Sequence, residues 1–245
     1  MSAHILLDQV CVDYPIYGAS GRSLRSALIS ASTGGRIHRE HNRINVRALN
    51  NITLEIREGD RIGLVGHNGA GKTTLLRVLA GVYEPSQGVI SVDGRISPMF
   101  DLTLGINHDA SGFENIRLRA LLLGLDRDYL NRHIEEIAET TGLGAYLHMP
   151  VRTYSTGMLL RLTFAIATSV TPDILLMDEW INTGDEEFLA ESHKRLSSLV
   201  DRSKILVLAT HEQEIMRDVC NRILVLEHGN VLREGTPTEI LGPRS

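Results

Sequence analysis

The stretch Gly66-His67-Asn68-Gly69-Ala70-Gly71-Lys72-Thr73-Thr74 decides how this chain is organised. Its pattern, G-x-x-x-x-G-K-[ST], is typical of a phosphate-binding loop between a buried strand and a helix. The flanking sequence fits, because residues 62–65 predict a strand and residues 72–80 predict a helix. We expect the loop amides and Lys72 to hold phosphates and the Thr73 hydroxyl to bind Mg²⁺. The alternative, a chance glycine-rich turn, is disfavoured by these flanking elements.

The amino-acid composition limits the classes of protein to which this chain can belong. The chain has 245 residues, of which 42% are hydrophobic but only 4% aromatic, so its core is aliphatic. That is expected of parallel strands covered by helices, in one large α/β domain or two small ones. A net charge of −5 gives no indication of a nucleic-acid partner. Cys11 and Cys220 form no metal-binding pattern, and no run of about 18 apolar residues predicts a membrane span.

The rest of the chain alternates between predicted strands and helices, which favours an open parallel sheet. Residues 89–92 and 95–99, joined by Asp93-Gly94, predict a β-hairpin. A helical segment runs from about 114 to 144, and another helix follows from Thr156 to about Ser169. The remaining predicted elements are strands at 4–14, 51–57, 174–177, 205–209, 223–226 and 231–232 and helices at 186–199 and 237–241.

The stretch between the first two strands, from about Pro15 to Arg47, is strongly basic. It holds one acidic residue, Glu40, against six arginines: Arg22, Arg25, Arg36, Arg39, Arg43 and Arg47. Residues 23–29 match a short amphipathic helix that Gly34-Gly35 would end. Two interpretations remain open, a solvated loop or a basic patch that faces anionic lipid headgroups or an anionic transported substrate.

Two sites predict the chemistry that would act on a bound nucleotide. Asp178 and Glu179 end a buried strand, where one carboxylate can hold Mg²⁺ and the next can deprotonate an attacking water. His211 follows strand 205–209, at the edge where ligands bind in open α/β sheets. We expect it to contact the γ-phosphate and steady that water. A charged pair that only ends a strand and a structural histidine are the alternatives.

The stretch Tyr154-Ser155-Thr156-Gly157-Met158 precedes a predicted helix. Ser155 is a natural N-cap, and Gly157 allows another backbone to approach closely. By itself this pattern indicates an ordinary helix cap.

Taken in order, these motifs resemble the ATP-binding cassette ATPases over nearly the whole chain. The resemblance implies an α/β P-loop NTPase fold of about residues 1–245, with a RecA-like parallel-sheet core, an antiparallel β subdomain and a helical subdomain at about 101–169. Residues 1–100 and 170–245 would form the other parts. It also implies a head-to-tail dimer with two ATP molecules, in which Ser155 and Gly157 act on the ATP of the partner. Glu179 resembles the catalytic carboxylate, His211 the switch histidine and Asp185 the residue that couples the two sites.

Further details resemble the branch that exports O-antigen, capsule, teichoic acid or galactan. These are Tyr-Ser-Thr-Gly-Met at 154–158, Gly184-Asp185, the basic insertion and Gly112-x-Glu114-Asn115. Tyr14 is the expected adenine-stacking aromatic, with Tyr17 as the alternative. Asp101 stands where most cassettes have glutamine, and we expect it to contact the metal through water. The loop around it, residues 101–108, departs from the pattern of the branch.

The resemblance therefore implies an ATPase that sits on the cytoplasmic face of the inner membrane and drives export of a lipid-linked polysaccharide. Its expected cofactors are ATP and Mg²⁺. Its expected partners are a second copy of itself and a separate permease that docks near residues 101–115, with no nucleic acid and no C-terminal carbohydrate-binding domain. The alternatives are a drug or lipid exporter, or a soluble cassette outside transport.

Overall fold

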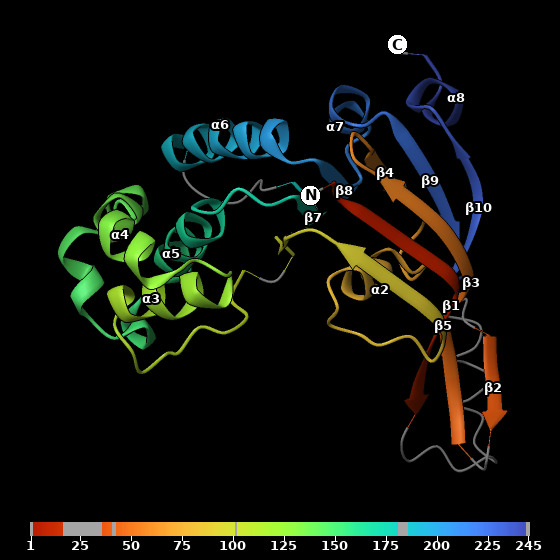
Figure 1. Cartoon of the computed structure of the whole chain (residues 1–245), viewed down its shortest axis with the longest axis horizontal. Helices are drawn as coiled ribbons and strands as arrows, with labels where there is room; N and C mark the ends of the chain where they lie inside the picture. The colour runs from red at the N-terminus through yellow and green to blue at the C-terminus, as the bar shows by residue number, and fades with distance from the viewer. Residues whose placement is uncertain (1, 17–35, 41–42, 101, 181–185, 244–245) are drawn as a thin grey trace. The chain divides into compact units, whose positions relative to one another are not determined.

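The chain forms two compact units in the computed structural model, which describes residues 2–16, 36–40, 43–100, 102–180 and 186–243 (Figure 1). The first unit contains Met1–Ile96, Leu176–Glu179 and Lys204–Ser245. The second contains Ser97–Leu175 and Trp180–Ser203. The phosphate-binding loop and the carboxylates at 178–179 thus belong to one unit, and the Tyr154–Met158 stretch belongs to the other.

The larger sheet has the strand order β10-β9-β4-β8-β7-β6. β4 pairs in parallel with β8 and with β9, while β9 and β10 form an antiparallel hairpin. β8 is buried along its whole length, which explains its unbroken apolar sequence. The bounds are β4 (Arg61–Val65), β6 (Ile96–Pro98), β7 (Ile174–Asp178), β8 (Ile205–Ala209), β9 (Arg222–Glu227) and β10 (Asn230–Gly235).

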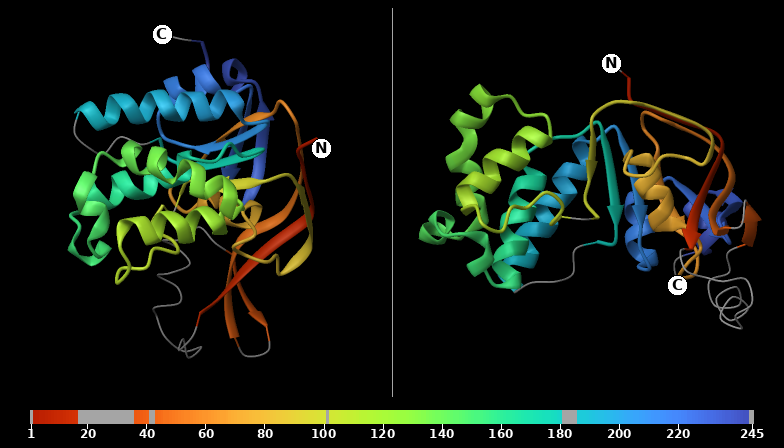
Figure 2. Two further views of the ribbon diagram at one scale, coloured as in Figure 1. Left: turned by 60° about the vertical axis from the view of Figure 1, so that its left-hand side comes forward. Right: turned by 90° about the horizontal axis from the view of Figure 1, so that it is seen from below.

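A second sheet is antiparallel, with the order β2-β3-β1-β5. The helix α2 (Lys72–Leu79) contacts β3 of this sheet and β8 of the larger one, so it lies between the two (Figure 2). Its leucines at 75, 76 and 79 are fully buried there. The bounds are β1 (His4–Ile16), β2 (Arg36–Glu40), β3 (Arg43–Arg57) and β5 (Gln87–Asp93).

The hairpin predicted at 89–99 is wrong. β5 pairs with β1, with Ile5 opposite Val92 and Leu7 opposite Ile90, whereas β6 belongs to the larger sheet. Gly94, at a φ of 126°, lets the chain pass from one sheet to the other. The strand signals were correct, but the long edge of β1 supplies β5 with a better-matched partner than β6 does.

Part of the basic stretch is also regular structure. β2 and the first half of β3 form an antiparallel hairpin in which Arg36 is opposite Arg47 and Ile37 is opposite Val46. The interpretation of a loop throughout 15–47 therefore does not hold for these residues. The short helix predicted at 23–29 lies outside the described residues.

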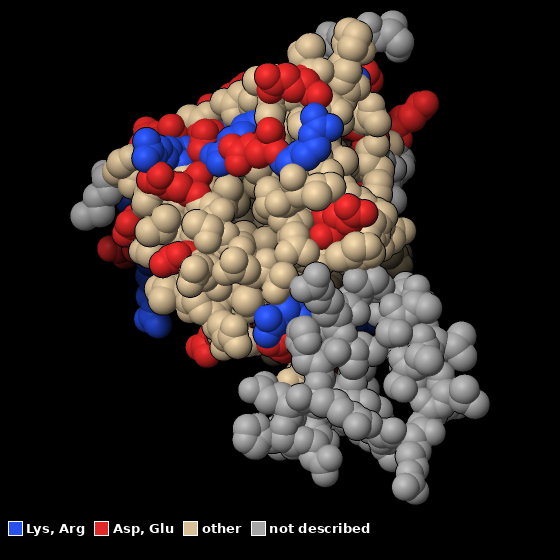
Figure 3. All heavy atoms as spheres, turned by 90° about the vertical axis from the view of Figure 1, so that its right-hand side faces the viewer, with Lys and Arg blue, Asp and Glu red and all other residues tan. Residues whose placement is uncertain are grey.

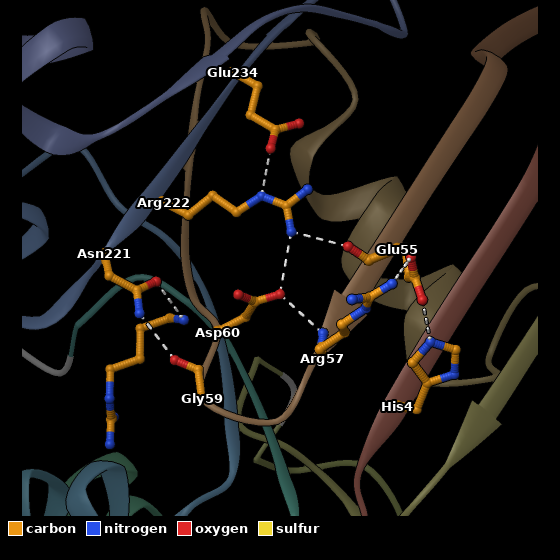
Figure 4. A network of polar contacts seen from close by, with 9 residues as sticks. His4, Glu55, Arg57, Gly59, Asp60, Asn221, Arg222 and Glu234 are labelled. Atoms are coloured by element: carbon orange, nitrogen blue, oxygen red, sulfur yellow. Dashed lines mark hydrogen bonds and ion pairs between the residues drawn. The ribbon is translucent and has the colours of Figure 1, made fainter.

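A polar network lies at the ends of the strands that are farthest from the phosphate-binding loop (Figure 4). Arg222 donates through Nε to Glu234 at 2.6 Å and through Nη1 to Asp60 at 3.1 Å and to the carbonyl of Glu55 at 2.9 Å. It thereby joins β9 to β10, to β3 and to the turn before β4. The Glu55 carboxylate itself accepts from Arg57 and contacts His4, and these interactions lower its pKa to about 2.

The face seen in Figure 3 shows acidic and basic side chains interleaved over its described part. Ion pairs of the first unit include Arg222–Glu234 and Arg57–Glu55. The Arg57–Glu55 pair is exposed, so solvent screening leaves it little effect on the stability of the fold.

The second unit is helical. Ser111 is the N-cap of α3 and forms a capping box with Glu114, and the predicted cap Ser155 is the N-cap of α5. The apolar side chains of α3, α4 and α5 form one core that includes Ile116, Ile134 and Leu162. The helices of the second unit are α3 (Gly112–Leu122), α4 (Arg127–Thr141), the short 3₁₀ helices η1 (Gly144–His148) and η2 (Val151–Thr153), α5 (Thr156–Thr168) and α6 (Glu186–Arg202).

Two further helices complete the first unit, α7 (Gln213–Val219) and α8 (Pro237–Leu241). Within the described ranges, none of the helices combines the length and apolar character needed to cross a bilayer.

Candidate nucleotide-binding site

The phosphate-binding loop connects β4 to α2, as predicted. Gly71 is the N-cap of α2 at a φ of 111°, and a Cβ there would lie 3.0 Å from the carbonyl oxygen of Ala48. The backbone conformation therefore favours glycine, and a Cβ at this position would also crowd Ala48. Lys72 Nζ donates to the carbonyl of Gly66 at 2.6 Å, so its ammonium group lies over the loop. The amides at the start of α2 and this cation make the loop an anion-binding surface.

The loop forms the floor of a cavity of about 430 Å³. This volume lies within the usual range for small-molecule sites, roughly 300–1,000 Å³. All of the lining residues belong to the first unit. They are Val46, Arg47, Ala48, Asn68, Gly69, Ala70, Gly71, Lys72, Thr73, Thr74, Asp178, Glu179, His211, His228 and Gly229.

Two predicted metal ligands meet in this cavity. The Thr73 hydroxyl donates to Asp178 Oδ2 at 2.7 Å, although 105 residues separate them in sequence. Both groups are hard oxygen donors, and Mg²⁺ with a nucleotide takes few protein ligands beside phosphate oxygens and water. The residues present therefore fit Mg²⁺. No cluster of three or more His, Cys, Asp or Glu side chains suited to a metal occurs among the described residues.

Glu179 lies directly after β7 in an unusual backbone conformation, with a φ of 84°. A non-glycine residue in this region costs about 1–3 kcal/mol and persists only where its surroundings hold it. The Glu179 N–H donates to the carbonyl of Ala209 at 2.7 Å, and the Thr210 hydroxyl donates to Glu179 Oε2 at 2.9 Å. His211 Nε2 lies 3.9 Å from Glu179 Oε1. The structure thus brings Glu179 and His211 together at the ends of neighbouring strands, as the sequence predicts.

Tyr14 lies outside the set of residues that line the cavity. Its hydroxyl is 3.4 Å from Thr74 Oγ1, and its ring meets Tyr83 edge-on with the centroids 5.6 Å apart. Burial raises the pKa of its phenol above the ordinary value. Tyr14 is therefore anchored beside the end of the loop, and its role as the adenine-stacking residue stays a prediction. Tyr17 lies outside the described residues.

Sequence reasoning missed one wall of the cavity, which β3 and the β9–β10 turn provide. Arg47 lines it and is held by two hydrogen bonds to Asp13, at 2.8 and 2.9 Å. The Gly229 amide donates to the carbonyl of Ala70 at 2.9 Å, which fixes the turn against the loop. The strands β3, β9 and β10 can be recognised from their own sequences, but nothing in the sequence shows that β3 and the β9–β10 turn pack against residues 69–71.

The second unit carries the Tyr154–Met158 stretch at its surface. Ser155 Oγ accepts from the N–H of Met158 at 3.2 Å, which confirms the cap, and Ser155 and Gly157 are both exposed. A Cβ on Gly157 would meet nothing nearer than Ser155 Oγ at 4.0 Å. The packing of this chain does not require glycine there.

The residue before Ser155 is held firmly. The Tyr154 hydroxyl donates to the carbonyl of Tyr146 at 2.7 Å, and a Cβ on Gly112 would come within 2.5 Å of that hydroxyl. The absence of a side chain at Gly112 therefore leaves room for the Tyr154 hydroxyl. The sequence indicated Gly112 only as part of a family pattern. Two other predicted site residues, Asp101 and Asp185, lie outside the described residues.

Comparison with known proteins identifies the family. Residues 49–182 match the model of the family described as "ABC transporter". An O-antigen export system ATP-binding protein, RfbE of Yersinia enterocolitica, is 45% identical over 94% of this chain and 97% of its own. RfbB of Myxococcus xanthus, also named as an O-antigen export ATP-binding protein, is 38% identical over 89% of this chain. There this chain spans only 49% of the relative.

A solved structure shows the same fold at 20% identity. It is the dimeric, ADP- and phosphate-bound ATP-binding cassette MJ0796, with a TM-score of 0.68 over 95% of this chain. The predicted fold class, an α/β cassette with a mostly parallel sheet and an antiparallel β part, is confirmed. The chain belongs to the ABC transporter family and is an ATPase that binds and hydrolyses ATP.

Proposed function

We propose that this chain is the ATPase subunit of an exporter that moves a lipid-linked polysaccharide across the inner membrane. The observation that carries the proposal is the 45% identity to an O-antigen export protein over nearly the full length of both chains. Teichoic acid export proteins named TagH are also similar, for example that of Bacillus anthracis at 32% identity over 98% of this chain. Drug exporters and soluble cassettes are the alternatives.

Within the site, Glu179 acts as the general base. Water attacks the γ-phosphorus of ATP and transfers a proton to the Glu179 carboxylate. The bond from the γ-phosphorus to its bridging oxygen breaks, and ADP leaves with the electron pair. Lys72 and the loop amides hold the phosphates, and His211 steadies the water. Mg²⁺, held by Thr73 and Asp178 and through water by Asp101, would neutralise charge on the phosphates.

The chain acts as a head-to-tail dimer in this proposal. Ser155 and Gly157 support it, because both are exposed and the glycine is not required by internal packing. A glycine with open space in front of it allows a ligand or another chain to come close. Asp185 would couple the two sites, and Tyr14 or Tyr17 would stack on adenine.

A permease partner is supported by the surface of the second unit. Three leucines of α3, Leu118, Leu121 and Leu122, are 45%, 38% and 76% exposed. Leu104, at 59% exposed, lies in the loop before them. Apolar side chains that gather on an exposed surface can form a contact with another protein. We expect the permease to dock here, which would place the subunit on the cytoplasmic face of the membrane.

The test combines co-purification with a variant of the base. The chain and the permease encoded beside it should co-purify, and their membranes should export the polysaccharide only when the ATPase is active. Glu179→Gln should bind ATP, hydrolyse it at least about 100-fold more slowly and accumulate as an ATP-bound dimer. Export of a drug instead of a glycan would overturn the substrate. Normal hydrolysis by Glu179→Gln would overturn the base.

A further inference from the structure

We propose that Thr210 is a positioning residue for the hydrolytic reaction: its hydroxyl fixes the carboxylate of Glu179. This proposal rests on the proposed role of Glu179 as the general base and adds a residue that the motifs do not point to. Thr210 is only 3% exposed, and its hydroxyl lies 2.9 Å from Glu179 Oε2.

The direction of this hydrogen bond is set by a second contact. The backbone N–H of Glu212 donates to Thr210 Oγ1 at 3.1 Å. The hydroxyl oxygen therefore serves as an acceptor on one side, and its own proton points to the carboxylate on the other. A hydroxyl has one donor and two acceptor positions, so both bonds are made at once. Thr210 thus links the start of α7 to the carboxylate.

The backbone of Glu179 is held by the same strand end. Its N–H donates to the carbonyl of Ala209, the residue before Thr210, and this contact supports the unusual φ of 84°. Ala209 and Thr210 together fix Glu179 at its backbone and at its side chain. Among the described residues, His211 also approaches the carboxylate, and its Nε2 lies 3.9 Å from the second oxygen, Oε1.

The two carboxylate oxygens therefore have different tasks. Oε2 is engaged by Thr210, which leaves Oε1, on the His211 side, to accept the proton of the attacking water. Without the hydroxyl, the carboxylate can rotate about its side-chain bonds and present either oxygen. A misplacement of about 1 Å at a reacting group can lower a rate by about 100-fold.

Thr210→Val and Thr210→Ser in the full chain test this proposal, with kcat and the KM for ATP measured separately. Valine keeps the shape and removes the hydroxyl. We expect its kcat to fall about 10- to 100-fold, with KM within about twofold, because ATP is held by the loop and not by Thr210. Serine keeps the hydroxyl and should retain kcat to within about threefold.

Thr141 supplies a matched control. It is fully buried, and its hydroxyl also bridges two groups, the carbonyl of Ala138 at 2.6 Å and the N–H of Leu143 at 3.1 Å. Neither partner lines the cavity. Thr141→Val should lower the melting temperature but leave kcat unchanged. Thermal melts of all variants separate slower chemistry from lost folded protein.

Two results would overturn the proposal. One is a Thr210→Val variant that binds ATP and keeps a normal kcat while Glu179→Gln is inactive, which would leave the base in place and remove the role of Thr210. The other is a Thr210→Ser variant as slow as Thr210→Val. Normal turnover by Glu179→Gln would instead reject the base itself, and with it the need to position it.

Discussion

Replacing Gly112 by alanine should destabilise the helical unit through a contact that the sequence does not reveal. The added Cβ would lie 2.5 Å from the Tyr154 hydroxyl, 2.7 Å from Leu147 Cδ2 and 3.1 Å from Leu147 Cα. Ordinary contacts are about 3.5–4.0 Å, so Tyr154 must move by about 1 Å. That movement breaks the bond from Tyr154 to the carbonyl of Tyr146.

The magnitude follows from two terms. Overpacking typically costs about 1–3 kcal/mol, and the lost hydrogen bond costs about 1 kcal/mol. Gly112→Ala should therefore lower the free energy of unfolding by about 3 kcal/mol. Tyr154→Phe alone should cost about 1 kcal/mol, since it removes the bond without a clash.

The double variant separates the clash from a general effect of alanine. Once the hydroxyl is gone, only the contact with Leu147 remains, so Gly112→Ala with Tyr154→Phe should cost about 2 kcal/mol and not the sum of about 4. Urea unfolding followed by far-UV circular dichroism measures these differences. Additive costs, or a cost below about 0.5 kcal/mol for Gly112→Ala alone, would refute the reasoning.

Three further predictions use other parts of the chain. Gly157→Ala should stabilise α5 by up to about 1 kcal/mol, because the added Cβ enters open space. The same variant should have lower ATPase activity at concentrations where the dimer forms. A stable variant with normal activity would contradict a role of Gly157 across a dimer interface. Arg222→Met should cost about 2–3 kcal/mol in chemical denaturation. The matched change at the exposed Arg57, Arg57→Met, should leave the denaturation midpoint nearly unchanged; equal costs would show that the network in Figure 4 does not join the sheets. Replacing three arginines of the β2–β3 hairpin, Arg36, Arg39 and Arg43, with glutamate should reduce export in membranes. Unchanged export would favour the interpretation that this segment is only solvated.

Much of the site was predictable because its chemistry is local in sequence. The loop 66–74, the pair Asp178–Glu179 and His211 each follow a strand whose apolar run is easy to recognise. Parallel strands end at the same edge of a sheet, so the prediction that these groups meet needed no coordinates. The bond from Thr73 to Asp178 shows this directly.

Other features could not be predicted from the sequence, and each has a physical reason. The hairpin at 89–99 failed because strand signals do not state which edge a strand will join, and β1 offered a better one. The leucines at 118, 121 and 122 match a helix, but periodicity does not show whether an apolar face is covered by the same chain. Thr210 was missed because a threonine after a buried strand carries no signal of its partner.

The sequence by itself therefore determined the nucleotide chemistry. The glycines and Lys72 of the loop predict a phosphate site, and carboxylates at the end of a parallel strand predict groups for Mg²⁺ and the attacking water at the same sheet edge. Only the tertiary structure decided which other groups complete the cavity. The turn at His228–Gly229 reaches the loop because β9 pairs with β4, the strand that precedes the loop. The β3 segment at Val46–Ala48 reaches it because β3 packs against α2, the helix that follows the loop. The structure also decided how Glu179 is held, because its backbone and its carboxylate are both fixed by residues 30 or more positions away, on the neighbouring strand.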